Sequence, residues 1–161
     1  MTRAFGILLA FLSFASVSAQ HRDPMLQTLE GRWKGTVETG GVRYPCEVAY
    51  VFALGGAYLE GTQTVYKDAS KRVAISEERM YLKSASEESI AVNTFSSTGV
   101  SRWGSWTGAA KSWTGEMQGS DGSRVSLVIE FSDAGHLLHT ATVFSAEGEL
   151  MEVVTVRLEK P

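Results

Sequence analysis

The sequence has one cysteine and three prolines among 161 residues. A single cysteine excludes an intramolecular disulfide, so the disulfide-stabilised class of small exported domains is excluded as well. Cys46 alternates with Tyr44, Val48 and Tyr50, and this pattern predicts a small buried hydrophobic residue. A reactive thiol is the alternative, but neither His nor Lys flanks Cys46 to lower its pKa.

The chain has no basic run, and its formal net charge is -3. This mild acidity gives no reason to expect nucleic acid or an anionic membrane surface as a partner. The sequence contains no Gly-x-Ser-x-Gly elbow and no phosphate-binding glycine loop. Its four aspartates fall at predicted caps or turns, where short carboxylates bond to local backbone. We therefore expect a protein that is not an enzyme.

Histidine is also scarce, with His21, His136 and His139 as the only three. His136 and His139 are three positions apart on a predicted strand, so they face opposite sides and do not chelate one ion together. We predict no metal site and no bound cofactor.

Only one long apolar run is present, from Ala4 to Ala15, and it follows the lone charge of Arg3. Small residues ending at Ala19 complete the pattern of a secretory signal peptide. The run is shorter than the roughly 20 residues that span a bilayer, although a retained anchor is the alternative. We predict cleavage near Ala19, export to the periplasm or medium, and no stable membrane insertion afterwards. Removing 19 of the 161 residues leaves 142, and loss of Arg3 moves the net charge from -3 to -4.

The rest of the chain, residues 20–161, has the length of one domain with a substantial core. Asp23-Pro24 predicts the start of a short helix, and Gly31 its end. Period-2 patterns separated by glycine-rich turns then predict ten strands. Their expected ranges are 31–39, 42–53, 57–66, 72–83, 90–96, 100–107, 111–118, 123–132, 136–145 and 149–159. Residues 72–83 have helical propensity around Ser76–Met80, but alternation favours a strand.

Ten antiparallel strands with short connections predict an all-β meander that closes into a barrel, because closure removes exposed edges. A barrel of this size has room for a small ligand. A β-sandwich is the competing architecture. We expect the barrel to be monomeric.

Gly31-Arg32-Trp33, after a short helical turn, resembles the Gly-x-Trp signature of lipocalins. Val156–Lys160 resembles the last strand of fatty-acid-binding proteins, which belong to the same calycin superfamily. The resemblance implies that Arg157 packs over Trp33 and closes one end of the barrel with Gly31. Such a contact would be a cation–π interaction.

Most of residues 20–161 also resembles an uncharacterised bacterial family of exported lipocalin-like domains. The resemblance rests on the order of five features: a leucine-rich turn, Gly-x-Trp-x-Gly, Gly-Gly before a strand, tryptophans in the middle, and Met-Glu before Arg. The matching residues are Gly31, Trp33, Gly35, Gly55, Gly56, Trp103, Trp106, Met151, Glu152 and Arg157. It implies a fold without an assigned activity. The helix pair that caps fatty-acid-binding barrels has no counterpart, so fatty-acid transport is not implied.

A small, mostly apolar molecule is the expected partner. Aromatic residues either line a pocket or fill the core, and polar residues predicted on the same face would orient a ligand. Trp103 and Trp106 differ in parity, so at most one of them points inward. The candidate ligand-binding residues are Tyr44, Tyr50, Tyr58, Thr62, Thr64, Tyr66 and Trp106. On the same predicted face, a buried Glu60 would need Arg43 or Arg102 as its partner.

Two alternatives stay open at this point. Nitrobindins, another calycin group, hold haem through a late histidine, and His139 shares parity with Leu137, Ala141 and Val143 as an inward ligand would. The other alternative is a fully packed structural or interaction domain without a ligand.

Overall fold

The computed structural model describes residues 23–109, 111–132 and 135–161. The expected signal peptide and its cleavage site lie outside these residues. The first element is α1 (Pro24–Leu29), a single short helix. Leu26 and Leu29 of this helix are buried. In the part of the chain that the structure describes, no helix has the length and apolar character needed to cross a membrane.

Ten β-strands follow α1, as the alternating pattern predicts. They are β1 (Gly31–Thr39), β2 (Val42–Ala53), β3 (Tyr58–Tyr66), β4 (Ala74–Ser86), β5 (Ser89–Ser96), β6 (Ser101–Ala109), β7 (Ser112–Gly119), β8 (Arg124–Phe131), β9 (His136–Phe144) and β10 (Leu150–Glu159), with a 3-10 turn, η1 (Leu54–Gly56), before β3. The segment 72–83, for which helix and strand were both considered, is therefore largely strand β4. Its Met80 and Leu82 are buried, and this burial outweighs the helical propensity of the preceding charged residues.

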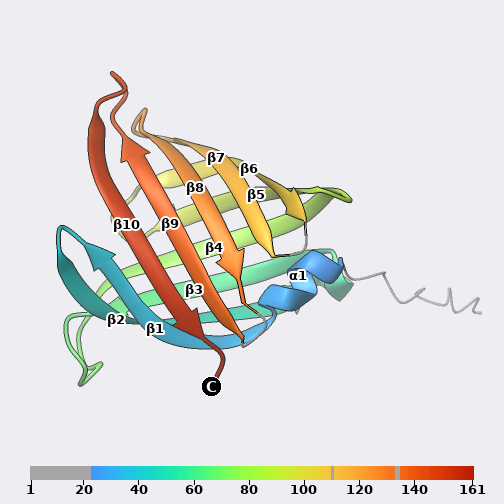
Figure 1. Ribbon diagram of the computed structural model, residues 1–161, viewed down its shortest axis with the longest axis horizontal. Coiled ribbons are helices and arrows are strands. Elements are labelled where there is room, and N and C mark those ends of the chain that lie inside the picture. The colour runs from blue at the N-terminus through green and yellow to red at the C-terminus, as the bar shows by residue number, and fades with distance from the viewer. Residues whose placement is uncertain (1–22, 110, 133–134) are drawn as a thin grey trace, which may run out of the picture.

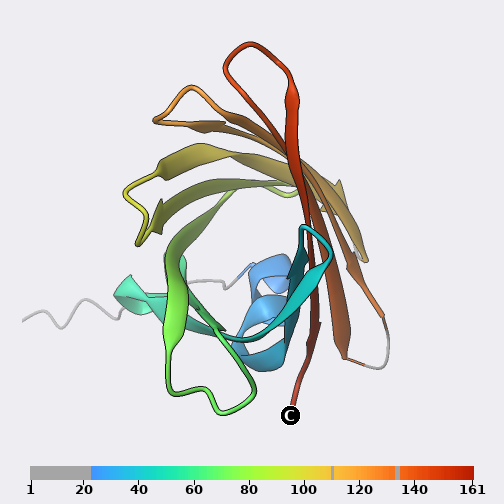
Figure 2. The same cartoon turned by 90° about the vertical axis from the view of Figure 1, so that its left-hand side faces the viewer.

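The strands form one closed antiparallel barrel, in which each pairs with its neighbours in sequence and β1 also pairs with β10 (Figure 1). The closing seam places Thr36 opposite Arg157 and Val37 opposite Val156. The predicted all-β meander barrel is confirmed, and the sandwich alternative is wrong. Figure 2 looks into the barrel and shows the strands arranged around α1.

One end of the barrel is closed by α1 and the side chain of Trp33, which is 3% exposed. The indole Nε1 donates to the backbone oxygen of Leu29 at 2.7 Å, which ties β1 to the end of α1. The ammonium of Lys160 lies 4.8 Å from the centre of the indole ring and donates to the oxygen of Thr28 at 3.1 Å. A cation thus covers the tryptophan, and Gly31, with φ of +117°, supplies the backbone turn between helix and strand.

The expectation that Arg157 is this cation is wrong. Arg157 lies between the inward-facing Val156 and Leu158, so strand alternation turns it to the outer wall. There its Nη1 lies 3.4 Å from a carboxylate oxygen of Glu38. The pKa of Glu38 is lowered, chiefly by its hydrogen bond with Arg43 and with a smaller contribution from Arg157.

Candidate ligand-binding cavity

Three of the seven predicted ligand-binding residues point into the barrel. Tyr44 is half-buried against the core, while Tyr50 and Trp106 are buried. Trp103, by contrast, is 49% exposed on the outer wall, so its difference in parity from Trp106 is confirmed. Tyr50 and Trp106 come from opposite halves of the chain and line one interior space.

The third strand has the reverse of the predicted facing. Its interior residues are Leu59, Gly61, Gln63 and Val65, as the burial pattern of β3 and the cavity lining show. The other four predicted residues are on the outer wall: Tyr58, Thr62, Thr64 and Tyr66. Glu60 shares this outer face, is exposed to solvent, and therefore needs no buried partner.

The reversal has a packing cause. Tyr50 lies opposite Gly61, and a Cβ at Gly61 would come within 2.6 Å of the Tyr50 ring. The phenol therefore occupies the space that this glycine leaves, and this arrangement fixes Gly61 on the inner face. Leu59 and Val65 share that face and gain more from burial than threonines would.

Trp106 is accommodated in the same way. A Cβ at Gly115 would come within 2.5 Å of the Trp106 ring and 2.9 Å of the Ser105 oxygen. The indole thus packs directly on the β7 backbone. Large aromatic side chains fit inside the barrel because glycines stand opposite them.

The interior space is a cavity of about 250 Å³. Its walls are mainly apolar, with contributions from Leu127, Ile129 and Val156, and it has thioethers from Met80 and Met117. An open hollow at the barrel mouth, beside the turns at Gly40 and Asp121, shares Arg102, Val143 and Glu152 with the cavity. The cavity is therefore reached from the end opposite α1.

Polar side chains without partners are concentrated at this cavity. Among the described residues, the buried side-chain atoms without a hydrogen-bond partner are Thr94 Oγ1, Arg102 Nε, Trp106 Nε1, Trp113 Nε1 and His139 Nε2. All of these residues except Trp113 line the cavity. Each such group buried without a partner costs free energy, so their presence in one place marks it as a candidate binding site.

Sequence reasoning did not select Thr94 or Arg102 as ligand-binding residues. Arg102 shares its face with Trp106, four positions later on the same strand, and Thr94 stands opposite Arg102 in the β5–β6 register. The available sequence signal was alternation along β6, which places Arg102 on the inner face once Trp106 is taken to point inward. Arg102 is half-buried on this inward face and its Nε is buried without a partner, which marks a site because an unpaired polar atom removed from water is costly.

His139 points inward, as its parity predicts. Burial lowers the pKa of its imidazole to about 4, so the ring is neutral at pH 7. The cavity alone is smaller than the roughly 300–1,000 Å³ of sites for drug-sized ligands, and haem is larger than those ligands. A haem bound to Nε2 would therefore have to extend from the cavity into the open hollow at the mouth.

Other chemistry is sparse in the described ranges. They contain no cluster of three His, Cys, Asp or Glu side chains suited to a metal ion. Cys46 is buried, and that burial raises the pKa of its thiol to about 11. Asp121 accepts hydrogen bonds from the Ser123 hydroxyl and amide, and these bonds lower its pKa.

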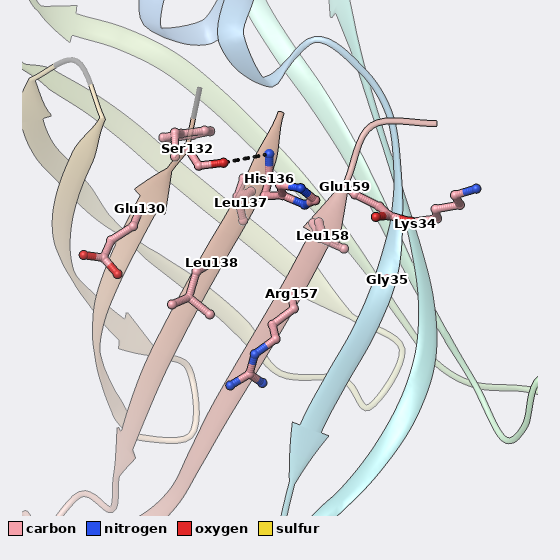
Figure 3. A pocket seen from close by; sticks show the side chains of 11 residues that line it. Lys34, Gly35, Glu130, Ser132, His136, Leu137, Leu138, Arg157, Leu158 and Glu159 are labelled. Carbon is pink, nitrogen blue, oxygen red and sulfur yellow. Dashed lines mark hydrogen bonds between the residues drawn. The ribbon is translucent and has the colours of Figure 1, made fainter. Parts of the chain in front are cut away.

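A further hollow, of about 510 Å³, lies on the barrel wall where β8, β9, β10 and β1 adjoin. Figure 3 shows that Leu138 and Arg157 extend from neighbouring strands, while Ser132 accepts a hydrogen bond from the His136 amide. Its charged residues, including Lys34, Glu130 and Arg157, are exposed to solvent. This hollow has none of the unpartnered buried atoms that distinguish the interior cavity.

Known structures share this architecture. Rv2717c from M. tuberculosis is similar with a TM-score of 0.68 at 16% identity, and the match covers 87% of this chain and 99% of that one. The S-type phycobiliprotein lyase CPES from Guillardia theta is similar with a TM-score of 0.58 at 8% identity, covering 84% of this chain and 89% of that one. No protein-family model and no curated protein matches the sequence. The chain thus shares with these two structures the fold of a closed antiparallel meander barrel.

Proposed function

We propose that this protein is an exported barrel that binds one small, mostly apolar molecule in its interior and performs no catalysis on it. The observation that carries the proposal is the cavity of about 250 Å³, closed by α1 and Trp33 at one end and reached from the mouth at the other. Mainly apolar walls with a few polar groups are typical of ligand sites. A phycobiliprotein lyase has the same fold, so this fold occurs in a protein that acts on a pigment-bearing partner.

The test is native mass spectrometry of protein purified from an exported fraction under non-denaturing conditions. We expect a mass excess that disappears on denaturation. Ala141 lines the cavity, so Ala141→Leu should fill part of it and reduce the bound fraction. Ala91 is on the outer wall of β5, and Ala91→Leu is the matched control that should retain the molecule.

A fully packed interaction domain is the competing function. It predicts no mass excess and no effect of Ala141→Leu on the uptake of any small apolar probe. That pair of results would refute ligand binding in the barrel.

Export rests on the pattern of Arg3, the apolar run from Ala4 and the small residues ending at Ala19. We propose that the mature chain starts near Gln20, is monomeric, and belongs with the uncharacterised bacterial exported lipocalin-like domains. N-terminal sequencing of the protein from a periplasmic extract tests the cleavage. An intact Met1 in exported protein would contradict it.

A further inference from the structure

The unpartnered polar atoms in the cavity are mostly hydrogen-bond donors. Arg102 Nε and Trp106 Nε1 donate and do not accept, whereas the Thr94 hydroxyl does both. The neutral His139 ring presents Nε2 as donor or acceptor, according to its tautomer. A molecule that satisfies this set must carry acceptor atoms, such as carboxylate or carbonyl oxygens.

The donors are separated along the barrel axis. Arg102 is the second residue of β6 and lines both the cavity and the mouth hollow. Trp106 follows four positions later, roughly 13 Å away at about 3.3 Å per strand residue. It also lines a small space beside Leu29 of α1, at the closed end. One polar pair, Thr94 and Arg102, is therefore at the mouth, and the other, Trp106 and His139, lies deeper.

Arg102 has no ion pair within 4 Å among the described residues, and its charge makes only the smallest contribution to the lowered pKa of Asp121. Glu152 accepts a hydrogen bond from the Thr39 hydroxyl, and Asp121 is bonded to Ser123. Glu78 and Glu152 both line the cavity, and their negative charges oppose an anionic group that is not in direct contact with Arg102. A ligand with a single anionic group therefore fits best.

We propose that the ligand is a small elongated organic acid. Its anionic group is held by Arg102 and Thr94 at the mouth, and its buried end presents a hydrogen-bond acceptor to Trp106 and His139. The apolar walls and the thioethers of Met80 and Met117 contact the part between. This inference rests on the proposed function, since it specifies the chemistry of the molecule in the same cavity.

The first test compares 4-phenylbutyrate with 4-phenylbutan-1-ol by isothermal titration calorimetry. These probes share their ring and chain length and differ in the anionic group. We expect the acid to bind about 10- to 100-fold more tightly, the range of a hydrogen bond to a charged group. Arg102→Met should abolish this preference while leaving the affinity for the alcohol unchanged. Thr94→Val should reduce the affinity for the acid by about 3- to 10-fold.

Arg124 is exposed at the start of β8, near the mouth, and Arg124→Met is the matched control that should retain the preference. Thermal unfolding of each variant verifies that it is folded. Equal binding of acid and alcohol by the parent protein would overturn the proposal. An acid preference that survives Arg102→Met would overturn it as well.

The second test addresses the buried end. We compare 4-(4-acetylphenyl)butyrate with 4-(4-isopropylphenyl)butyrate, which have similar shapes but differ in one carbonyl. The acetyl compound should bind about 3- to 10-fold more tightly, and Trp106→Phe should remove that advantage by deleting the indole N–H. Trp103→Phe is the outer-wall control. If the isopropyl compound binds the parent protein as tightly as the acetyl compound, the ligand needs no hydrogen-bond acceptor at its buried end, and that part of the proposal is wrong.

The two levels of inference fail differently. If the probes bind without regard to charge or carbonyl and Ala141→Leu blocks them, the organic-acid proposal is wrong while the binding function stands. If no probe binds and no molecule is retained, both are wrong.

Discussion

Removing the tryptophan that closes the barrel is the most direct test of the fold's construction. Trp33 is 3% exposed, and truncation of a buried large aromatic residue typically costs about 3–5 kcal/mol. Trp33→Ala should therefore lower the free energy of unfolding by that amount. Trp33→Phe keeps most of the apolar burial but leaves the Leu29 carbonyl without its indole donor, at a cost of about 1–3 kcal/mol.

The neighbouring cations give a sharper comparison. Lys160→Met removes a cation over the indole and a hydrogen bond to Thr28, so it should cost about 0.5–1 kcal/mol at this exposed position. Arg157→Met removes only an exposed contact with Glu38 and should cost between zero and about 1 kcal/mol. In the Trp33→Ala background, Lys160→Met should cost less than in the parent, because its ring contact is already absent.

Urea denaturation at 25 °C, monitored by circular dichroism, measures these differences. A change in the urea concentration at the midpoint of unfolding, with an unchanged dependence of free energy on urea, gives the change in stability. If Trp33→Ala is as stable as the parent protein, Trp33 does not close the barrel end in the way described. A clear energetic coupling between Trp33 and Arg157, with none between Trp33 and Lys160, would refute the assignment of the covering cation.

Other residues give further expectations. Gly115→Ala should displace the Trp106 indole, cost about 1–3 kcal/mol, and shift tryptophan fluorescence; an unchanged emission spectrum would contradict the contact. The folded pKa of His139, about 4, lies below its ordinary value of 6.5, so its contribution to stability is full above pH 6.5 and falls by about 3 kcal/mol as the pH drops to 4. His139→Leu should flatten that part of the pH–stability curve, and NMR titration reads the pKa directly. Cys46 should react with a thiol reagent only on unfolding, since its buried thiol has a pKa of about 11; prompt labelling of the native protein would argue against its burial.

Alternation and glycine turns were sufficient to predict the ten strands, because each element has a strong local pattern. β3 shows where that method fails. Tyr58 and Thr62 have high strand propensity on either face, and the inward face was fixed by a contact between Tyr50 and Gly61 on different strands. Sequence parity along one strand does not report such a pairing.

The site was harder to predict than the fold. The Arg157 assignment followed a resemblance, whereas the structure places Lys160 over the indole, three residues later and beyond the end of β10. Arg102 and Thr94 became a site only once the β5–β6 register brought them opposite each other. Alternation along a strand shows which residues share a face. Which residues from different strands meet in one cavity depends on how the strands pair when the barrel closes.

The seam between β1 and β10 has a consequence for biogenesis. Lys34 pairs with Glu159, so the first and last strands of the barrel are hydrogen-bonded neighbours. A nascent chain cannot complete the ladder until its final segment has been synthesised, and before then both terminal strands expose unpaired edges. A premature stop within the last strand would therefore leave an aggregation-prone product rather than a smaller working barrel.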